Sequence, residues 1–262
     1  MVKVYTIASG KGGTGKTTVS INLGTVLAQL GKETYLMDAD IGMANVGLLL
    51  GLQDAPVTLH EILAGKCTIN DAIYEGPAGL KVIPSGISLQ GFQQADQDKM
   101  REVMGEIIKR CEFLLMDAPA GISKDGVVPL AVSDEVILVV NPELASIVDA
   151  LKIKILTEVV GGHVLGSIIN RVDQDDIDTI TKKMEKVLGV KVLGIIPEDA
   201  NVRRASSAKV PIVIKFPTSP ASIAIKRIAS DMVGVPYKEE PVAGKRDGFI
   251  DRLSKALFSK KT

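Results

Sequence analysis

"SGKGGTGKTT", residues 9–18, lies between a strand pattern over residues 2–9 and a helix pattern over residues 16–30 that Gly31 ends. Residues 10–17, called the phosphate loop below, fit the spacing G-x-x-x-x-G-K-[ST]. Glycines let the backbone N–H groups of such a loop turn toward phosphate oxygens. The helix that follows adds the positive end of its dipole. This stretch therefore predicts an α/β domain that binds a nucleotide.

Each residue of the phosphate loop has an expected role. Lys16 is expected to bridge the β and γ phosphates, and the Thr17 hydroxyl is expected to ligate Mg²⁺. Lys11 is a second lysine, although a phosphate-binding loop needs only one. The other residues predicted to bind the nucleotide here are Gly10, Gly12, Gly13, Thr14, Gly15 and Thr18.

Strand and helix patterns alternate along the rest of the chain. This alternation indicates right-handed βαβ units and a mostly parallel, doubly wound sheet in a single domain. Ligands of such sheets bind at the carboxyl ends of the strands, where all the motifs below fall. The predicted strands cover residues 33–38, 79–86, 112–119, 135–142, 164–172 and 190–197, and predicted helices include 97–110, 144–159 and 176–188.

Composition narrows the class of protein. Cys67 and Cys111 lack a paired spacing, so we expect no disulfide framework and a cytosolic setting. His60 and His163 are isolated, which gives no support to a zinc site. The N-terminus enters a strand pattern without a signal peptide, and the apolar runs are far shorter than the ~20 residues of a membrane span. We expect a soluble protein, or one that lies on a membrane without crossing it.

The charge of the chain is zero overall but unevenly distributed. Residues 245–262 contain six of the 31 Lys and Arg residues and two of the 31 Asp and Glu residues, a net charge of +4. The remaining residues therefore contain 25 basic and 29 acidic groups, a net charge of −4. Because the body is acidic, nucleic acid is not an expected partner.

The phosphate loop and segments along nearly the whole chain resemble the MinD branch of the deviant Walker A ATPases. In that family the extra lysine, here Lys11, reaches across a dimer interface to the nucleotide of the partner. The resemblance implies an ATP-bound homodimer that loses an interface contact when the γ-phosphate is lost. The segments are "SGKGGTGKTT", "DADIGMANVGLLLG", "LLMDAPAG", "VVNPELASIVDA", "INRV", "IPEDANVRRA" and "GFIDRLSKALF".

Two aspartates follow the second predicted strand. Asp38 and Asp40 are two residues apart and would share a face if the strand continued. The resemblance implies that they begin the first switch loop, where Asp40 orients or activates the attacking water. It also implies that Asp38 supports the Mg²⁺ shell and that Asn45 helps to hold the switch. Alternatively, Asp40 caps a helix over residues 42–50.

Asp117 ends the apolar segment "EFLLMD". This is the Walker B arrangement, which reaches Mg²⁺ directly or through water, although an aspartate here could also be structural. The next residues, "APAG" with Pro119 and Gly121, suit a turn that senses the γ-phosphate. The predicted catalytic residues are Lys11, Lys16, Asp40 and Asp117, and the predicted metal-binding residues are Thr17, Asp38, Asp40 and Asp117.

The segment "INRVD", residues 169–173, raises the question of which base is bound. It resembles the guanine-binding motif N-K-x-D with Arg171 in place of lysine, and Asp173 could accept two hydrogen bonds from guanine. In the MinD group the same asparagine, here Asn170, reads adenine. A later loop, here Pro197, Glu198 and Asp199, helps it. Because the rest of the chain matches the ATPases, we expect ATP, with GTP as the alternative.

The C-terminal end differs from the body. Residues 1–234 are the predicted ATPase domain, residues 235–246 a flexible linker, and residues 247–262 a basic amphipathic helix. Such a helix suits the inner surface of an anionic membrane, although it could instead pack on its own domain or bind a partner. Two copies on one dimer would gain avidity. The residues predicted to contact the membrane are Phe249, Ile250, Leu253 and Leu257.

These patterns together favour a MinD-like ATPase that cycles between the cytoplasm and the inner face of the membrane. It would hydrolyse ATP slowly without an activator and position cell-division or other partner proteins. Asp149 matches a partner-binding aspartate of the family, although it could be an ordinary charge on a helix surface. The alternatives are a ParA-like DNA-segregation ATPase and a nucleotide-gated scaffold with negligible turnover.

Overall fold

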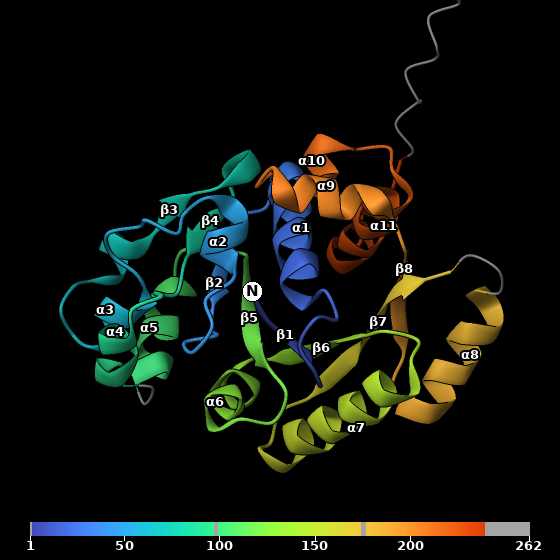
Figure 1. Ribbon diagram of the computed structural model, residues 1–262, viewed down its shortest axis with the longest axis horizontal. Helices are drawn as coiled ribbons and strands as arrows, with labels where there is room; N and C mark the ends of the chain where they lie inside the picture. The colour runs from blue at the N-terminus through green and yellow to red at the C-terminus, as the bar shows by residue number, and fades with distance from the viewer. Residues whose placement is uncertain (1, 97–98, 174–176, 239–262) are drawn as a thin grey trace, which may run out of the picture.

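A single sheet organises the part of the chain that the computed structural model describes, residues 2–96, 99–173 and 177–238 (Figure 1). Its strand order is β3-β4-β2-β5-β1-β6-β7-β8. Neighbouring strands are parallel except β3 and β4, which are antiparallel. The strands are β1 (Lys3–Ser9), β2 (Thr34–Asp38), β3 (Tyr74–Glu75), β4 (Lys81–Ile83), β5 (Phe113–Ala120), β6 (Glu135–Val140), β7 (Val164–Val172) and β8 (Val192–Pro197).

Helices cover both faces of the sheet (Figure 1). The first layer contains α1 (Lys16–Gln29), α2 (Val46–Leu50), α9 (Ala200–Ser207), α10 (Ile212–Lys215) and α11 (Pro220–Val233). The opposite layer contains α3 (Leu59–Leu63), α4 (Leu89–Gln94), α5 (Met100–Ile107), α6 (Lys124–Val132), α7 (Leu144–Val159) and α8 (Ile177–Leu188). Short 3₁₀ helices cover Ile69–Ala72 and Pro77–Gly79.

The side chains of β1 show how both layers form one core. Tyr5 and Ile7 join the buried cluster beneath α1 and α11, whereas Val4 and Ala8 point to the opposite layer. Successive residues of a strand face opposite sides, so a strand that is covered on both sides must be apolar at nearly every position. This explains the continuous aliphatic runs of the sequence and confirms the predicted doubly wound sheet.

Most predicted elements are confirmed, and the differences have local causes. The strand predicted over residues 112–119 is observed as β5 one residue later, Phe113–Ala120, and it continues past Asp117 because a register shift lets Ala120 pair with Ser9 of β1. The two-residue strand β3 was not predicted. The helix predicted over residues 97–110 is observed as α5, and residues 97–98 lie outside the described ranges.

The helix predicted over residues 42–50 begins four residues later than expected. It is α2, and its N-cap is Asn45. The backbone N–H groups of Asn45 and Val46 both donate to the Asp38 carboxylate, which fixes the start of the helix there. The interpretation of Asp40 as the cap of this helix is therefore wrong.

The described chain ends shortly after α11. Residues 235–238 are the beginning of the predicted linker, and the rest of the linker lies outside the described residues. The predicted tail helix lies outside them too, with Phe249, Ile250, Leu253 and Leu257. Within the described ranges, no helix has the length and hydropathy needed to cross a membrane.

Candidate functional site

The predicted motifs meet at the carboxyl ends of β1, β2 and β5. From β1 the chain passes through α1 to β2, while β5 leads through α6 to β6 on the other side of β1. The connections therefore diverge beside β1, and such a divergence opens a crevice at the strand ends of a doubly wound sheet. The phosphate loop begins at the end of β1 and lies at this crevice.

The phosphate loop is curved around two glycines with left-handed backbone angles. Gly13 has φ +79° and Gly15 has φ +90°. A Cβ atom at Gly15 would lie 2.4 Å from Nδ2 of Asn170, and this amide donates to the Thr14 carbonyl at 2.7 Å. The Thr14 hydroxyl is buried without a hydrogen-bond partner. The loop is thus a concave surface with an unsatisfied polar group, which suits an anionic ligand.

The start of the loop is packed between two other segments. A Cβ atom at Gly10 would lie 2.2 Å from the backbone carbon of Asp149 in α7, so only glycine fits there. On the other side, the Gly121 N–H donates to the Ser9 carbonyl at 2.9 Å. Gly121 has φ +78°. The "APAG" segment is therefore joined to the residue just before the phosphate loop, and its predicted role as a sensor of the γ-phosphate stays a prediction.

Asp117 is the centre of a buried polar network. Lys16 Nζ lies 2.9 Å from its Oδ1, and the Thr17 hydroxyl donates to its Oδ2 at 2.6 Å. The Ser20 hydroxyl lies 2.7 Å from Oδ1 and was not predicted as a site residue. Its position four residues after Lys16, on the same helix face, is the sequence feature that could have identified it. The network fixes both the lysine and the hydroxyl that the motif requires.

Asp38 shapes the loop over residues 39–46, called the switch loop below. Its carboxylate accepts backbone N–H groups from Asp40 at 3.2 Å and from Asn45 and Val46 at 3.0 Å. Burial, and next the charge of Asp117, raise the pKa of Asp38 to about 7. The observed bonds give Asp38 a structural role, and its predicted support of a metal shell stays a prediction.

Asp40 and Asn45 are connected through Met43. Asp40 Oδ1 accepts the Met43 N–H at 2.9 Å, and Asn45 Nδ2 donates to the Met43 carbonyl at 2.7 Å. Burial raises the pKa of Asp40 above its ordinary value. Both side chains line the same cavity as the phosphate loop. The structure thus brings the predicted water-orienting residue to the predicted phosphate site.

Two adjoining cavities make up the site. The first, of about 300 Å³, is called the phosphate cavity and is lined by residues 12–18 with Asp40, Asn45 and Ala120. The second, of about 430 Å³, is called the base cavity and lies between the phosphate loop, β7, β8 and α9. Gly15, Thr18 and Arg171 line both cavities, so they form one continuous site. The predicted base-binding residues that line the base cavity are Asn170, Arg171, Pro197, Glu198 and Asp199.

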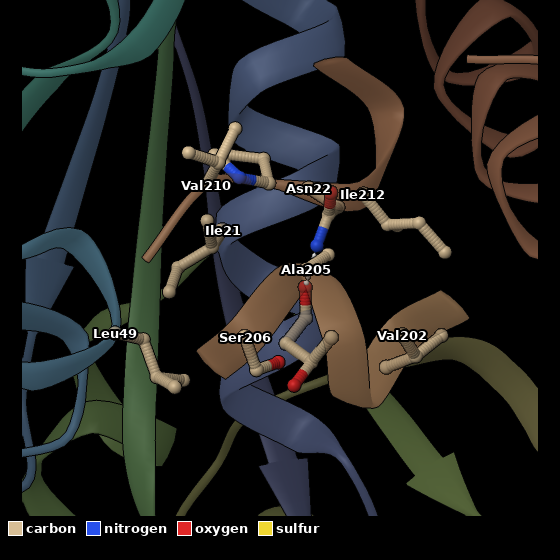
Figure 2. A pocket seen from close by; sticks show the side chains of 10 residues that line it. Ile21, Asn22, Leu49, Val202, Ala205, Ser206, Val210 and Ile212 are labelled. Carbon is tan, nitrogen blue, oxygen red and sulfur yellow. Dashed lines mark hydrogen bonds between the residues drawn. The ribbon is translucent and has the colours of Figure 1, made fainter. Parts of the chain in front are cut away.

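Figure 2 shows a separate small void between α1 and α9, which shares Thr18, Val202 and Ser206 with the lining of the base cavity. Ile21 and Asn22 of α1 face Ala205 and Ser206 of α9 across a void of only about 20 Å³. Such a void has room for roughly one water molecule and not for a ligand. Leu49 of α2 also lines this void and the phosphate cavity, so the helix after the switch loop packs beside both.

Asp199 and Arg171 have additional structural roles. Asp199 caps α9 by accepting the Asn201 N–H at 2.9 Å, and it also accepts the Ala221 N–H of α11 at 3.3 Å. Burial alone would raise the pKa of Asp199, but these bonds outweigh it and lower the pKa. Arg171 has φ +60°, a strained angle for a residue with a side chain. Strain of this kind concentrates at binding sites.

The second lysine of the loop points away from the cavity network. Lys11 Nζ lies 2.7 Å from Oε2 of Glu143, and both side chains are partly or largely exposed. This hydrogen bond, and next the charge of Lys11, lower the pKa of Glu143. Glu143 is the N-cap of α7 and was not predicted as a site residue. On the same helix, Asp149 pairs with Lys152 at 2.9 Å.

The residues of the site fit ATP and Mg²⁺. The cradle at Gly15 and the unpaired Thr14 hydroxyl suit phosphate oxygens, and the Thr17 hydroxyl and Asp117 are the hard oxygen ligands that Mg²⁺ prefers. Within the described residues, no group of three or more His, Cys, Asp or Glu side chains is arranged to hold a metal ion. The ion would therefore depend on phosphate oxygens and water as well, as is usual for Mg²⁺.

Comparisons with known proteins agree with this geometry. A family model described as the CobQ/CobB/MinD/ParA nucleotide binding domain matches residues 5–212. An uncharacterized ATP-binding protein of Methanocaldococcus jannaschii is 46% identical over 261 residues, which are 100% of this chain and 98% of that protein. The cell division ATPase MinD of Pyrococcus furiosus aligns with a TM-score of 0.84 and 35% identity, over 89% of this chain and 99% of that one. The septum site-determining protein MinD of Pyrococcus horikoshii, complexed with Mg-ADP, aligns with a TM-score of 0.82 and 33% identity, over 88% and 96% of the two chains.

Proposed function

Because the chain belongs to the CobQ/CobB/MinD/ParA nucleotide-binding family, we propose that it is an ATP-dependent switch of the MinD type. It binds ATP with Mg²⁺, forms a homodimer in that state and hydrolyses the nucleotide slowly. The observation that carries this proposal is the continuous site of two cavities with a second lysine, Lys11, which precedes Gly12 of the phosphate cavity and is partly exposed in a pair with Glu143.

The base cavity favours adenine over guanine. Nδ2 of Asn170 donates to the Thr14 carbonyl, so the amide oxygen of Asn170 is left to accept the exocyclic amine of adenine. Asp173, the residue that would read guanine, is exposed and is not among the residues that line either cavity. ATP is therefore the proposed nucleotide.

The proposed hydrolysis depends on residues that the network already holds in place. Lys16 and the backbone N–H groups of the phosphate loop would bind the phosphates, and Thr17 and Asp117 would hold the metal. Mg²⁺, when bound, supplies neutralisation of the charge that develops on the phosphate oxygens. Asp40 faces the phosphate cavity and would orient the attacking water. Thr17, Asp117 and Asp40 are each held by a hydrogen bond through a side-chain oxygen. These side chains therefore need little reorganisation when the nucleotide and the metal bind.

The proposed dimer interface surrounds Lys11. Met43, Ile122 and Leu144, called the outer rim below, are 75%, 61% and 79% exposed. The Met43 N–H donates to Asp40, and Ile122 follows Gly121, whose N–H donates to the Ser9 carbonyl. Leu144 follows Glu143, which pairs with Lys11. Exposed apolar side chains next to residues with such contacts are typical of an interaction surface. A second copy would cover the outer rim and receive Lys11 at its own phosphates.

The output of the switch is proposed to be recruitment at the inner face of the membrane. The predicted tail, residues 247–262, would anchor the ATP dimer, and hydrolysis would return the chain to the cytoplasm. A protein partner involved in cell division or positioning would bind α7. Val148, Ile155 and Val159 of this helix are exposed on one side, next to Asp149.

Sedimentation with anionic liposomes tests this proposal. We expect the full chain to pellet with ATP and Mg²⁺ and to remain in solution with ADP, and a chain that ends at Ala243 should stay in solution in both. Neutral liposomes are the control for the basic tail. Equal pelleting with ATP and ADP, or pelleting of the truncated chain, would contradict the membrane switch. Salt-dependent binding to DNA or a lack of ATP turnover would then favour the ParA-like or the scaffold alternative.

A further inference from the structure

His60 connects the switch loop to a different part of the fold. It lies in α3, is 1% exposed, and its Nε2 is 2.8 Å from the Ile41 carbonyl. A carbonyl oxygen can only accept, so Nε2 carries the proton in this contact. Ile41 directly follows Asp40, the residue proposed to orient water. The imidazole therefore holds the backbone of the switch loop one peptide unit from that carboxylate.

Two glycines pack against the Nδ1 side of the His60 ring. A Cβ atom at Gly86 would lie 2.5 Å from Nδ1 of His60, and one at Gly91 would lie 3.0 Å from the same atom. Nδ1 itself is buried without a hydrogen-bond partner. The ring is thus enclosed by backbone on the Nδ1 side and makes its short hydrogen bond on the other, toward the switch loop. A buried polar atom left unpaired costs stability, which points to a role other than stability for this side chain.

The helix that carries His60 is itself fixed to the sheet. The Leu59 N–H donates to the Pro84 carbonyl at 2.9 Å, just after β4. Thr58 and Glu61 form a capping box at the start of α3, with the Thr58 N–H 2.8 Å from Glu61 Oε2. Asp38 holds the two ends of the switch loop through the N–H groups of Asp40, Asn45 and Val46. His60 donates to the Ile41 carbonyl, which lies between these ends, from a helix that is anchored separately to the segment after β4.

We propose that His60 is a positioning residue for ATP hydrolysis, because its Nε2–H group fixes the Ile41 carbonyl and thereby the place of Asp40 in the phosphate cavity. This inference rests on the proposed ATPase function. It separates two properties of the site: the phosphate loop binds the nucleotide without His60, whereas the water is oriented correctly only when His60 holds the switch loop.

Three substitutions of His60 test the hydrogen bond. His60→Gln places an amide N–H near the position of Nε2, His60→Asn carries the same group but is too short to reach Ile41, and His60→Leu has no donor. We expect kcat to fall roughly tenfold or more in His60→Asn and His60→Leu, with ATP affinity changed less than about threefold. His60→Gln should keep most of the activity. His163→Leu, at an exposed histidine, is the matched control and should change neither value.

Amide hydrogen exchange provides a readout that does not depend on turnover. In His60→Asn the amides of residues 40–46 should exchange faster than in His60→Gln, while those of α1 should not change. Equal kcat in His60→Asn and His60→Gln, or equal exchange in the switch loop, would overturn the inference. If the unmodified chain does not hydrolyse ATP, the proposed function fails, and the exchange comparison still decides whether His60 holds the loop. Thermal unfolding of each variant identifies any that do not fold.

Discussion

Lys16 and Lys11 lie five residues apart in the same loop, and each pairs with one carboxylate. The distances are similar, 2.9 Å from Lys16 to Asp117 and 2.7 Å from Lys11 to Glu143. The surroundings differ: the side chains of Lys16 and Asp117 are 7% and 0% exposed, and those of Lys11 and Glu143 are 33% and 62% exposed. Distance alone therefore does not distinguish the two lysines, but access to solvent does.

The difference in exposure separates the tasks of the two pairs. A buried charge that loses its partner is left without a compensating charge. Moving Lys16 out to another subunit would leave Asp117 in that state, so Lys16 stays inside its own site. An exposed ion pair contributes little to stability, so Lys11 can leave Glu143 at little cost and bind a stronger anion. The structure thus contains one lysine that is fixed and one that can exchange its partner, which is what a nucleotide shared between two copies requires.

Replacement of Lys16 by alanine should have the largest effect. It removes the phosphate contact and leaves the Asp117 charge unpaired, so nucleotide binding should be lost and the free energy of unfolding should fall by about 3 kcal/mol. Binding of a fluorescent ATP analogue and unfolding in urea measure the two effects. ATP affinity within tenfold of the unmodified chain would contradict this view of the buried pair.

Replacement of Asp40 by asparagine should separate hydrolysis from binding. The amide oxygen can still accept the Met43 N–H, so the switch loop should keep its shape. Turnover should fall roughly 100-fold or more, while ATP binding remains. Asp54→Asn, at an exposed aspartate paired with Gln53, is the control and should keep full activity. Normal turnover in Asp40→Asn would remove Asp40 from the proposed mechanism.

Two neighbouring glycines test the shape of the loop. Gly15 has φ +90° and no room for a Cβ atom, whereas a Cβ atom at Gly12 would meet nothing within 4 Å. Gly15→Ala should cost about 1–3 kcal/mol of stability and weaken nucleotide binding, because the backbone strain is joined by a clash with Asn170. Gly12→Ala should leave the stability nearly unchanged, because its Cβ atom meets no protein atom within 4 Å. Calorimetric unfolding measures the stability of each variant, and titration with ATP measures nucleotide binding. Equal losses of stability in the two variants would contradict this prediction.

The exposed pair should show the smallest effect on stability. Glu143→Gln removes the charge that faces Lys11, and the free energy of unfolding should barely change, because an exposed ion pair contributes little to stability. Because a neutral amide oxygen holds Lys11 more weakly than the carboxylate does, the ATP dimer should form at a lower protein concentration than before. A weaker dimer in Glu143→Gln, measured by light scattering across a concentration series, would mean that Glu143 supports the interface instead.

The sequence predicted those features that are encoded in short contiguous segments. The phosphate loop, α7 and the order of strands and helices follow from local spacing and apolar periodicity, and the structure agrees with them. Ser20, Glu143 and His60 were missed as site residues because their roles depend on contacts between distant segments. Ser20 and Asp117 are 97 residues apart, and Lys11 and Glu143 are 132 apart. The spacing of Ser20 from Lys16 marks it only as a residue on the same helix face, and no local pattern contains the pair of Lys11 and Glu143.

The last residue of β5 and the start of α2 also depend on contacts between distant segments. Ala120 belongs to the sheet because of its register with β1, and α2 begins at Val46 because Asp38 receives its first N–H groups. Strand ends depend on the neighbouring strand more than on propensity. Conversely, Asp40 and the phosphate loop line one cavity, as the sequence led us to expect, whereas the alternative interpretation of Asp40 as a helix cap placed the start of α2 four residues too early.

Sedimentation velocity of hydrolysis-deficient protein tests the division of tasks between the two lysines most directly. Asp40→Asn would be compared with the double variant Lys11→Ala, Asp40→Asn, each with Mg²⁺ and either ATP or ADP, after ATP binding by both has been measured. We predict that Asp40→Asn is a dimer in ATP and a monomer in ADP, and that the double variant binds ATP but stays a monomer in both. A double variant that forms the ATP dimer as well as Asp40→Asn would contradict the role assigned to Lys11.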